Sequence, residues 1–321
     1  MTEFHLSEQS SSLHHEPKVT EYLKCYKLPS PPSVRYGHIR FSSLQKKHRV
    51  ELFGQAWLPD QSIGTILFIH GFSEHVGNYG QLIQDFVRER YAVASIDLRG
   101  HGLSDGPQGH VDNPSYYAED IEQFAHIVFP HLTPKRPLYI WAHSMGGLIA
   151  LQLLLRNKLP IIPAAVTLSS PLLGFPALQG KQKFLAKFAP VMAKVLPSLQ
   201  IAHDLSPENL SKNTAYLENR SKDPLIGTHI TPQWLISMKH TVAEIHNAAL
   251  KFQKLSPTLC FLAGEEKITS LMEARKFAFH AYASLKHKVV EFPGMRHELE
   301  KELECHARIL SESLAWFRSH N

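Results

Sequence analysis

The sequence has few cysteines and lacks a long apolar run. Its 321 residues include three cysteines, Cys25, Cys260 and Cys305, and no C-x-x-C pair. An odd number without close spacing excludes a disulfide framework and the common kinds of zinc site. No apolar stretch approaches the roughly 18 residues of a membrane-spanning helix, and the N-terminus lacks the apolar core of a secretory signal. We therefore expect a soluble, cytoplasmic protein with reduced thiols.

A dense basic stripe is also missing. The formal net charge is +5 with neutral histidines, and the lysines are spread along the chain. Nucleic-acid binding would need clustered cations interleaved with aromatic residues, so we expect no nucleic-acid partner. The mild positive charge favours transient contact with an anionic membrane surface, which places the protein at the periphery of the inner face of the membrane. The oligomeric state is not indicated by any pattern.

From Val50 onward, short apolar runs alternate with helical periodicity. We predict a buried strand in the segment "GTILFIH" and further strands in "YAVASID", "PLYIWAH", "AAVTLSSP", "PTLCFLAG" and "HKVVEFPG". Stretches between them, such as "QLIQDFVRER", carry apolar residues on one helical face. Strands that alternate with helices predict an α/β fold, with a mostly parallel sheet covered by helices on both faces.

Two segments interrupt this alternation. Residues 1–35 are polar and contain "LPSPPS", which predicts a flexible polar leader. Residues 171–247 contain several prolines and no convincing strand. Within them, "KQKFLAKFAPVMAKVLP" fits equally a core-packed helix kinked at Pro190 and a lid helix over a lipid-sized pocket. Their place between the fourth and fifth predicted strands favours a helical cap, which divides the core into residues 36–170 and 248–321.

The stretch "YIWAHSMGG" places Ser144 in a turn between a predicted strand and a predicted helix. Such a turn lifts the hydroxyl out of the sheet and points the first amides of the helix at a reacting oxygen. Ala142 stands where the G-x-S-x-G pattern has its first glycine, and it differs from glycine by one methyl group. A serine in this position can also simply cap a helix. The preceding strand and following helix favour a nucleophile.

A serine nucleophile needs a base, and the base needs an acid to orient it. Of the 21 histidines, His297 in "EFPGMRHE" follows the last predicted strand, at the carboxyl edge of the sheet where Ser144 also lies. The acid is expected after a strand between the serine and the histidine. There "CFLAGEEKITS" offers Glu265 and Glu266, while the competitor Asp223 lies in the inserted segment.

Two backbone amides complete the predicted site. Phe72 follows the first predicted strand in "LFIHGF", and Met145 directly follows the proposed nucleophile. Their N–H groups can converge on one oxygen and stabilise its developing charge. A nucleophile, an acid, a base and oxyanion donors in this chain order predict a serine hydrolase.

Six segments in this order resemble the monoacylglycerol lipase and lysophospholipase family of α/β-hydrolases. They are "HGFSEHVGNY", "DLRGHGLSDG", "HSMGG", "LSSPLLG", "SKDPLIG" and "FPGMRHEL". The resemblance runs from about Gly37 to the C-terminus. It implies an eight-stranded, mostly parallel sheet with a helical cap, and hydrolysis of single-chain lipids without a cofactor or a metal.

By position, the resemblance implies that Ser144 is the nucleophile and His297 the base, with Phe72 and Met145 as oxyanion donors. The family usually has an aspartate as the acid, and alignment of "GEEKIT" on its glycine and isoleucine puts Glu266 there, with Glu265 left as the alternative. The glutamate-rich segment is also similar to bacterial lysophospholipase L2-type members. This favours a lysophospholipid over a monoacylglycerol.

The expected function is that of a serine carboxylic-ester hydrolase with a Ser-His-Glu triad and an acyl-enzyme. Its substrate would be a lysophospholipid or a monoacylglycerol. Apolar residues of the predicted cap, Phe175, Phe184 and Phe188, favour acyl chains over the alternatives, a small-ester esterase or a peptidase on the same scaffold. A non-catalytic ligand receptor with this fold would generally lack a triad residue, and here all three types are present.

Overall fold

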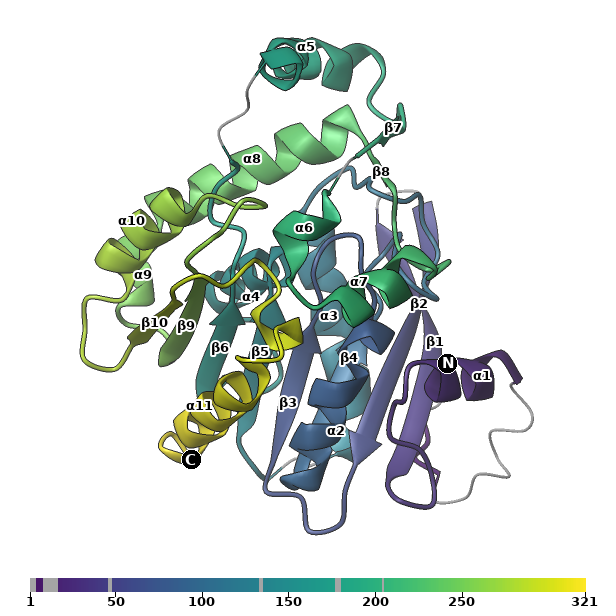
Figure 1. Cartoon of the computed structure of the whole chain (residues 1–321). Coiled ribbons are helices and arrows are strands. Elements are labelled where there is room, and N and C mark those ends of the chain that lie inside the picture. The colour runs from purple at the N-terminus through teal and green to yellow at the C-terminus, as the bar shows by residue number, and fades with distance from the viewer. Residues whose placement is uncertain (1–3, 8–16, 46–47, 133–134, 177–179, 204) are drawn as a thin grey trace.

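The computed structural model describes residues 4–7, 17–45, 48–132, 135–176, 180–203 and 205–321. Its centre is an eight-stranded sheet in the order β1-β2-β4-β3-β5-β6-β9-β10 (Figure 1). The strands are β1 (Arg35–Gln45), β2 (His48–Leu58), β3 (Gly64–Ile69), β4 (Tyr91–Ile96), β5 (Leu138–His143), β6 (Ala165–Ser169), β9 (Thr258–Ala263) and β10 (Lys288–Phe292). All six predicted strands are confirmed. β1 and β2 form an antiparallel pair, β2 joins β4 antiparallel, and the remaining pairs are parallel.

Helices cover both faces of the sheet, as predicted. Alternate residues of β3 show why: Leu67 and Ile69 belong to one buried apolar cluster, Ile66 and Phe68 to the other. The first cluster includes residues of α3 (Ser115–Val128), α4 (Met145–Arg156), α8 (Pro232–Asn247) and α10 (Leu271–Ala281). The second includes residues of α1 (Pro17–Cys25), α2 (Gly80–Arg88) and α11 (His306–Arg318). Short 3-10 turns lie at η2 (Val76–Tyr79), η3 (Phe129–His131) and η4 (Leu299–Lys301).

The N-terminal region departs from the prediction. A flexible leader over residues 1–35 is wrong for the described part, because α1 is a helix that packs on the core. Val19, Tyr22 and Leu23 are at most 4% exposed, and Phe4 is 1% exposed. These three helical residues share one face at spacings of three and four. The segment is polar overall, so its composition gave no sign of this apolar face. Residues 8–16 of the predicted leader lie outside the described part.

The cap segment, residues 171–247, leaves the sheet after β6 and carries most of the remaining helices (Figure 1). They are α5 (Gly180–Val195), α6 (Pro207–Leu210), α7 (Thr214–Ser221) and α8, and α9 (Ala249–Phe252) follows directly. β7 (Ile201–Ala202) and β8 (His229–Ile230) pair antiparallel, and at two residues each they are too short to give a strand pattern in the sequence. The predicted domain boundaries remain predictions.

Helix α5 lies on α8, at the far side of α8 from the sheet (Figure 1). In its described second half, Ala189 and Ala193 are buried, whereas Phe188, Val191 and Val195 are 47%, 60% and 70% exposed. These three apolar side chains therefore do not pack in the core. The side chain of Phe184 lies outside the described part.

Candidate active site

The turn that holds Ser144 is tightly constrained. β5 ends at His143 and α4 begins at Met145, and Ser144 between them has the unusual backbone angles φ +51° and ψ −117°. A Cβ at position 146 would lie 2.4 Å from the carbonyl oxygen of Ile69, so Gly146 lets the helix pack against the end of β3. A strained backbone conformation of this kind persists only where the surrounding fold holds it in place. Such conformations are common at functional residues.

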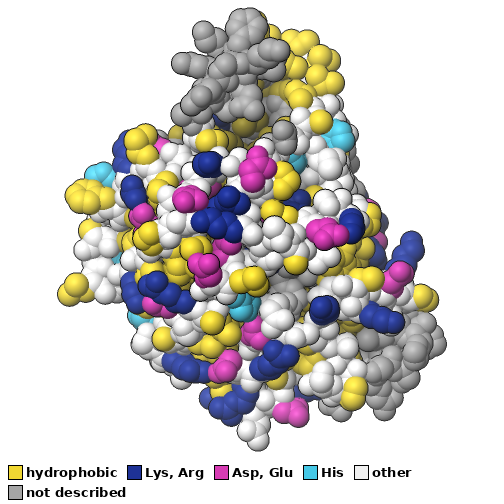
Figure 2. Space-filling model, viewed as in Figure 1, with side chains coloured by type: hydrophobic (Ala, Val, Ile, Leu, Met, Phe, Trp, Pro, Cys, Tyr) yellow, Lys and Arg dark blue, Asp and Glu magenta, His cyan; other side chains and the backbone are white. Residues whose placement is uncertain are grey.

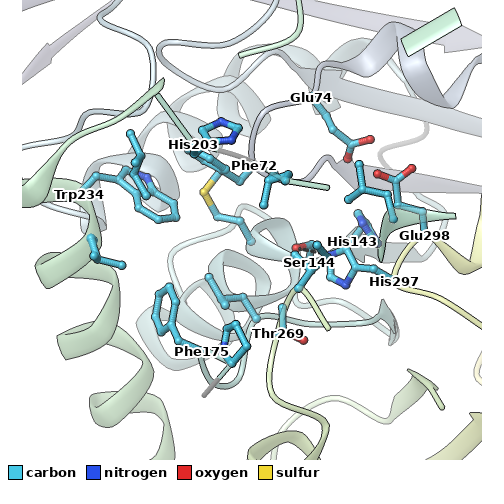
Figure 3. Close-up of a pocket in the computed structure, with 18 of the residues that line it drawn as sticks. Phe72, Glu74, His143, Ser144, Phe175, His203, Trp234, Thr269, His297 and Glu298 are labelled. Atoms are coloured by element: carbon cyan, nitrogen blue, oxygen red, sulfur yellow. Dashed lines mark hydrogen bonds between the residues drawn. The ribbon is translucent and has the colours of Figure 1, made fainter. Parts of the chain in front are cut away.

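The structure brings three of the predicted site residues together. His297 Nε2 lies 2.9 Å from Ser144 Oγ, and His297 Nδ1 lies 2.6 Å from Glu266 Oε2. Glu266 follows β9 and His297 follows β10, so both lie at the carboxyl edge of the sheet, as Ser144 does. Figure 3 shows His297 beside Ser144.

The two competing acids lie elsewhere. Glu265 is 49% exposed at its side chain and pairs with Lys212 at 3.7 Å. Asp223 lies 3.1 Å from His75, not beside His297. Of the three carboxylates considered, only Glu266 reaches His297.

The surroundings of Glu266 and His297 favour the charged form of each side chain, an anion and a cation. Burial opposes a charged Glu266, but His297 and the backbone amides of Thr269 and Ile268, at 2.9 and 2.7 Å, hold its pKa below the usual range. Burial likewise opposes a charged His297, but the carboxylate of Glu266 outweighs it and raises the pKa of His297. The pair thus stabilises the imidazolium that forms when a histidine accepts a proton from serine.

A cavity of about 240 Å³ opens above Ser144, and its two ends differ in character (Figure 3). Figure 3 shows Phe175 and Trp234 on one side of Ser144, and this end of the cavity is mainly apolar. Lys239 and His203 also line the cavity, and Nζ of Lys239 lies 5.8 Å from the centre of the Phe175 ring. The other is polar and is lined by Glu74, His143, Arg220 and Glu298. Ser144 lies between them. Phe175 thus faces the cavity as expected, whereas Phe188 is not among the described lining residues.

The polar end holds two buried carboxyl groups, Glu74 and Glu298, which are 2% and 1% exposed. Tyr79 donates a hydrogen bond to Glu74, whereas Oε2 of Glu298 has no hydrogen-bond partner among the described residues. Burial, and then the charge of Glu74, raise the pKa of Glu298 to about 8. Burial also opposes a charged Glu74, but the cations Lys301 and Arg220 and the hydrogen bond from Tyr79 lower its pKa. At neutral pH the pair therefore offers one O–H donor and one carboxylate acceptor.

The sequence interpretation missed this polar end. Glu298 directly follows His297, and Glu74 lies two residues after Phe72, so their positions beside predicted site residues were an available signal. Arg220 comes from the last turn of α7 in the cap segment. No local pattern connects it to Ser144.

Phe72 and Met145, the predicted oxyanion donors, both line the cavity. Met145 is the first residue of α4, where backbone amides are not used within the helix. The ring of Phe72 packs on Trp234 at 4.3 Å between centroids, which ties the loop after β3 to the cap segment. In the described part of the chain, no group of three His, Cys, Asp or Glu side chains is arranged to hold a metal ion.

The sheet order, the helices on both faces and the strained serine turn after β5 define an α/β-hydrolase. Residues 60–304 match the model of the Hydrolase_4 family, described as serine aminopeptidase, S33, and the chain belongs to this family.

Several similar proteins are named as phospholipases or monoglyceride lipases. The chain is 28% identical to the phospholipase YtpA of Bacillus subtilis over 248 residues, which cover 77% of this chain and 93% of the relative. It is also 28% identical to the monoglyceride lipase of Rattus norvegicus, covering 83% and 86%. The crystal structure of a monoacylglycerol lipase from Paleococcus ferrophilus has the same fold, with a TM-score of 0.73 at 23% identity, covering 84% of this chain and all of the other.

Proposed function

We propose that this protein is a serine carboxylic-ester hydrolase that releases a fatty acid from a monoacylglycerol. The observation that carries the proposal is the hydrogen-bonded series Ser144–His297–Glu266, placed between an apolar and a polar end of one cavity. An acyl chain fits the apolar end, and the alcohol part of the ester then meets the polar end. The name of the rat relative, a monoglyceride lipase, supports this substrate, whereas the name of the Bacillus subtilis relative, a phospholipase, supports a phospholipid.

In this mechanism His297 accepts the proton of Ser144 as the hydroxyl attacks the acyl carbonyl. The backbone amides of Phe72 and Met145 stabilise the oxyanion, a contribution that is typically about 10²- to 10³-fold in rate for one donor. Glu266 holds His297 in the required tautomer and stabilises its charged form. His297 then protonates the departing glycerol, and water hydrolyses the acyl-enzyme by the same steps in reverse order.

The polar end favours glycerol over a phosphate-containing head group. The free hydroxyls of a monoacylglycerol both donate and accept, which suits a protonated Glu298 beside an ionised Glu74. A phosphodiester only accepts, and it would meet the carboxylate of Glu74. Arg220 also lines this end and supports a lysophospholipid as the second candidate, the substrate that the sequence alone favoured.

Contact with a membrane surface is a further part of the proposal. Apolar side chains at the end of α5 and beyond are exposed: Phe188, Val191, Val195, Leu196, Leu199 and Ile201. Figure 2 shows hydrophobic atoms gathered there, at the far end of the cap segment. No described helix has the length and apolar character to cross a bilayer. A surface of this kind can rest on the lipid that supplies the substrate.

The test is fatty-acid release from 1-monoacylglycerol, lysophosphatidylcholine and lysophosphatidylethanolamine of equal chain length, with Ser144→Ala as the control. We expect the highest kcat/KM on monoacylglycerol and no turnover by Ser144→Ala. A preference for the lysophospholipids would replace the first candidate by the second. Turnover by a folded Ser144→Ala protein would contradict the whole mechanism.

A further inference from the structure

Helix α1 lies outside the residues that match the family model, yet it contacts the loop beside the active site. Val19 and Leu23 anchor it in the core. Tyr22 and Tyr26, one turn apart, face the segment after β3, where both rings pack on His75 at 5.7 and 4.6 Å between centroids. The fit is close, because a Cβ at Gly77 would lie 2.6 Å from the ring of Tyr26.

The two tyrosine hydroxyls join three segments in one hydrogen-bonded network. The hydroxyl of Tyr22 accepts from the backbone amide of Gly77 at 2.7 Å and lies 3.1 Å from Nδ1 of His75. His75 Nε2 lies 3.1 Å from Oδ2 of Asp223, and the hydroxyl of Tyr26 donates to Oδ1 of the same carboxylate at 2.8 Å. These partners are all satisfied if Tyr22 donates to Nδ1 and the proton of His75 lies on Nε2.

Both segments that α1 holds also line the cavity. His75 directly follows Glu74 and comes three residues after Phe72, in the loop proposed to stabilise the oxyanion. Asp223 closes the turn after α7, three residues beyond Arg220. A guanidinium nitrogen of Arg220 reaches the carbonyl of Ser73 at 3.4 Å. The network therefore fixes the loop from Phe72 to His75 and the turn from Arg220 to Asp223 relative to each other.

We propose that α1, together with Tyr26 directly after it, is a positioning element of the active site. Tyr22 holds the loop of Phe72 and Glu74, and Tyr26 holds the cap turn of Arg220 through Asp223. This inference rests on the proposed function of the cavity. Small displacements of groups that position a substrate or an oxyanion are costly to the rate, so loss of one hydroxyl is expected to affect kinetics as well as stability.

The test uses Tyr22→Phe, Tyr26→Phe and Asp223→Ala variants of the whole chain. For each, kcat and KM are measured on monoacylglycerol, and Tm is measured alongside. The tyrosine changes each remove one hydroxyl, and Asp223→Ala removes both acceptor oxygens of the carboxylate. Tyr139→Phe is the matched control, because its ring is buried near the start of β5 and its hydroxyl donates to Asn321 at 3.4 Å, away from this network. On the usual strength of one hydrogen bond, we expect Tyr22→Phe to lower kcat about 5- to 10-fold. Tyr26→Phe and Asp223→Ala should raise KM by about 5-fold or more on the same basis.

The double variant Tyr26→Phe/Asp223→Ala sharpens the test. Asp223→Ala already removes the partner of the Tyr26 hydroxyl, so the added Tyr26→Phe change should raise KM no further. Tyr139→Phe should leave kcat and KM within about twofold, whatever its effect on Tm. The proposal is overturned if the Tyr22 and Tyr26 variants behave like Tyr139→Phe, or if the double variant shows multiplied effects. Should a tyrosine variant fail to fold, Asp223→Ala alone decides. Turnover by Ser144→Ala would overturn the proposed function instead, so the two failures are distinguishable.

Discussion

Glu266 and Glu298 are two buried glutamates near the same histidine, and their surroundings drive them to opposite protonation states. Glu266 accepts from His297 and two backbone amides, and its pKa is lowered. Glu298 adjoins His297 in the chain, has an unpartnered oxygen and faces a second carboxylate, and its pKa is raised to about 8. Burial acts on both, so hydrogen-bond donors and neighbouring charge decide the outcome. Environments that separate two carboxyl groups in this way are typical of sites with distinct chemical roles.

The largest effect is expected from Glu266→Gln. The amide keeps the size of the side chain but cannot stabilise the imidazolium or fix the required tautomer, so kcat should fall by about 10³- to 10⁴-fold. Steady-state turnover of monoacylglycerol measures it. Glu265→Gln, in the exposed neighbouring residue, is the control and should change kcat by less than about twofold. If Glu265→Gln lowered kcat more than Glu266→Gln does, Glu265 and not Glu266 would be the acid that orients His297.

A smaller effect, confined to glycerol esters, is expected at the other carboxyl group. Glu298→Leu removes the donor to the glycerol hydroxyls, and the ratio of kcat/KM on monoacylglycerol to kcat/KM on a p-nitrophenyl ester of equal chain length should fall about 10-fold. Glu298→Gln keeps a donor and should retain most of that ratio. Glu304→Gln serves as the exposed control. An equal loss on both substrates would mean that Glu298 only supports the fold around His297.

The smallest effect is a pH dependence of the same ratio. A raised pKa means that Glu298 is protonated below about pH 8 and ionised above it. As pH rises through 8, the donor is lost and two carboxylates repel, so the ratio should decline by a few-fold. Parallel pH profiles on the two esters measure this. The decline should be absent in Glu298→Gln, and a decline that persists there would assign it to another group.

The sequence predicted the parts of the site that follow strands. Ser144 and the segment of Glu266 follow buried strands, and His297 lies in the turn region after the edge strand β10; parallel strands bring such positions to one edge of the sheet. The choice between Glu265 and Glu266 depended on which side chain turns inward, and both fit the same local pattern. Arg220 could not be predicted, because its place depends on how the cap segment folds back over the sheet.

The fold was predictable to a similar degree. Continuous apolar runs identify β3, β4, β5, β6 and β9, since these strands are buried along their whole length. The edge strand β10 is exposed at its first two residues and is identified by the shorter run in "KVVEF". The β1–β2 pair alternates polar and apolar residues and gives a weaker signal. Helix α1 was missed because its apolar face consists of a few residues in a polar segment, and because the partners of Tyr22 and Tyr26 lie 53 and 197 residues away.

The most direct test of the central claim is labelling by a fluorophosphonate, followed by mass spectrometry of the modified peptide. The account predicts one adduct, on Ser144, that forms more slowly in the presence of monoacylglycerol and is absent from Ser144→Ala. An adduct on another residue, or labelling of Ser144→Ala at the rate of the unmodified protein, would contradict it.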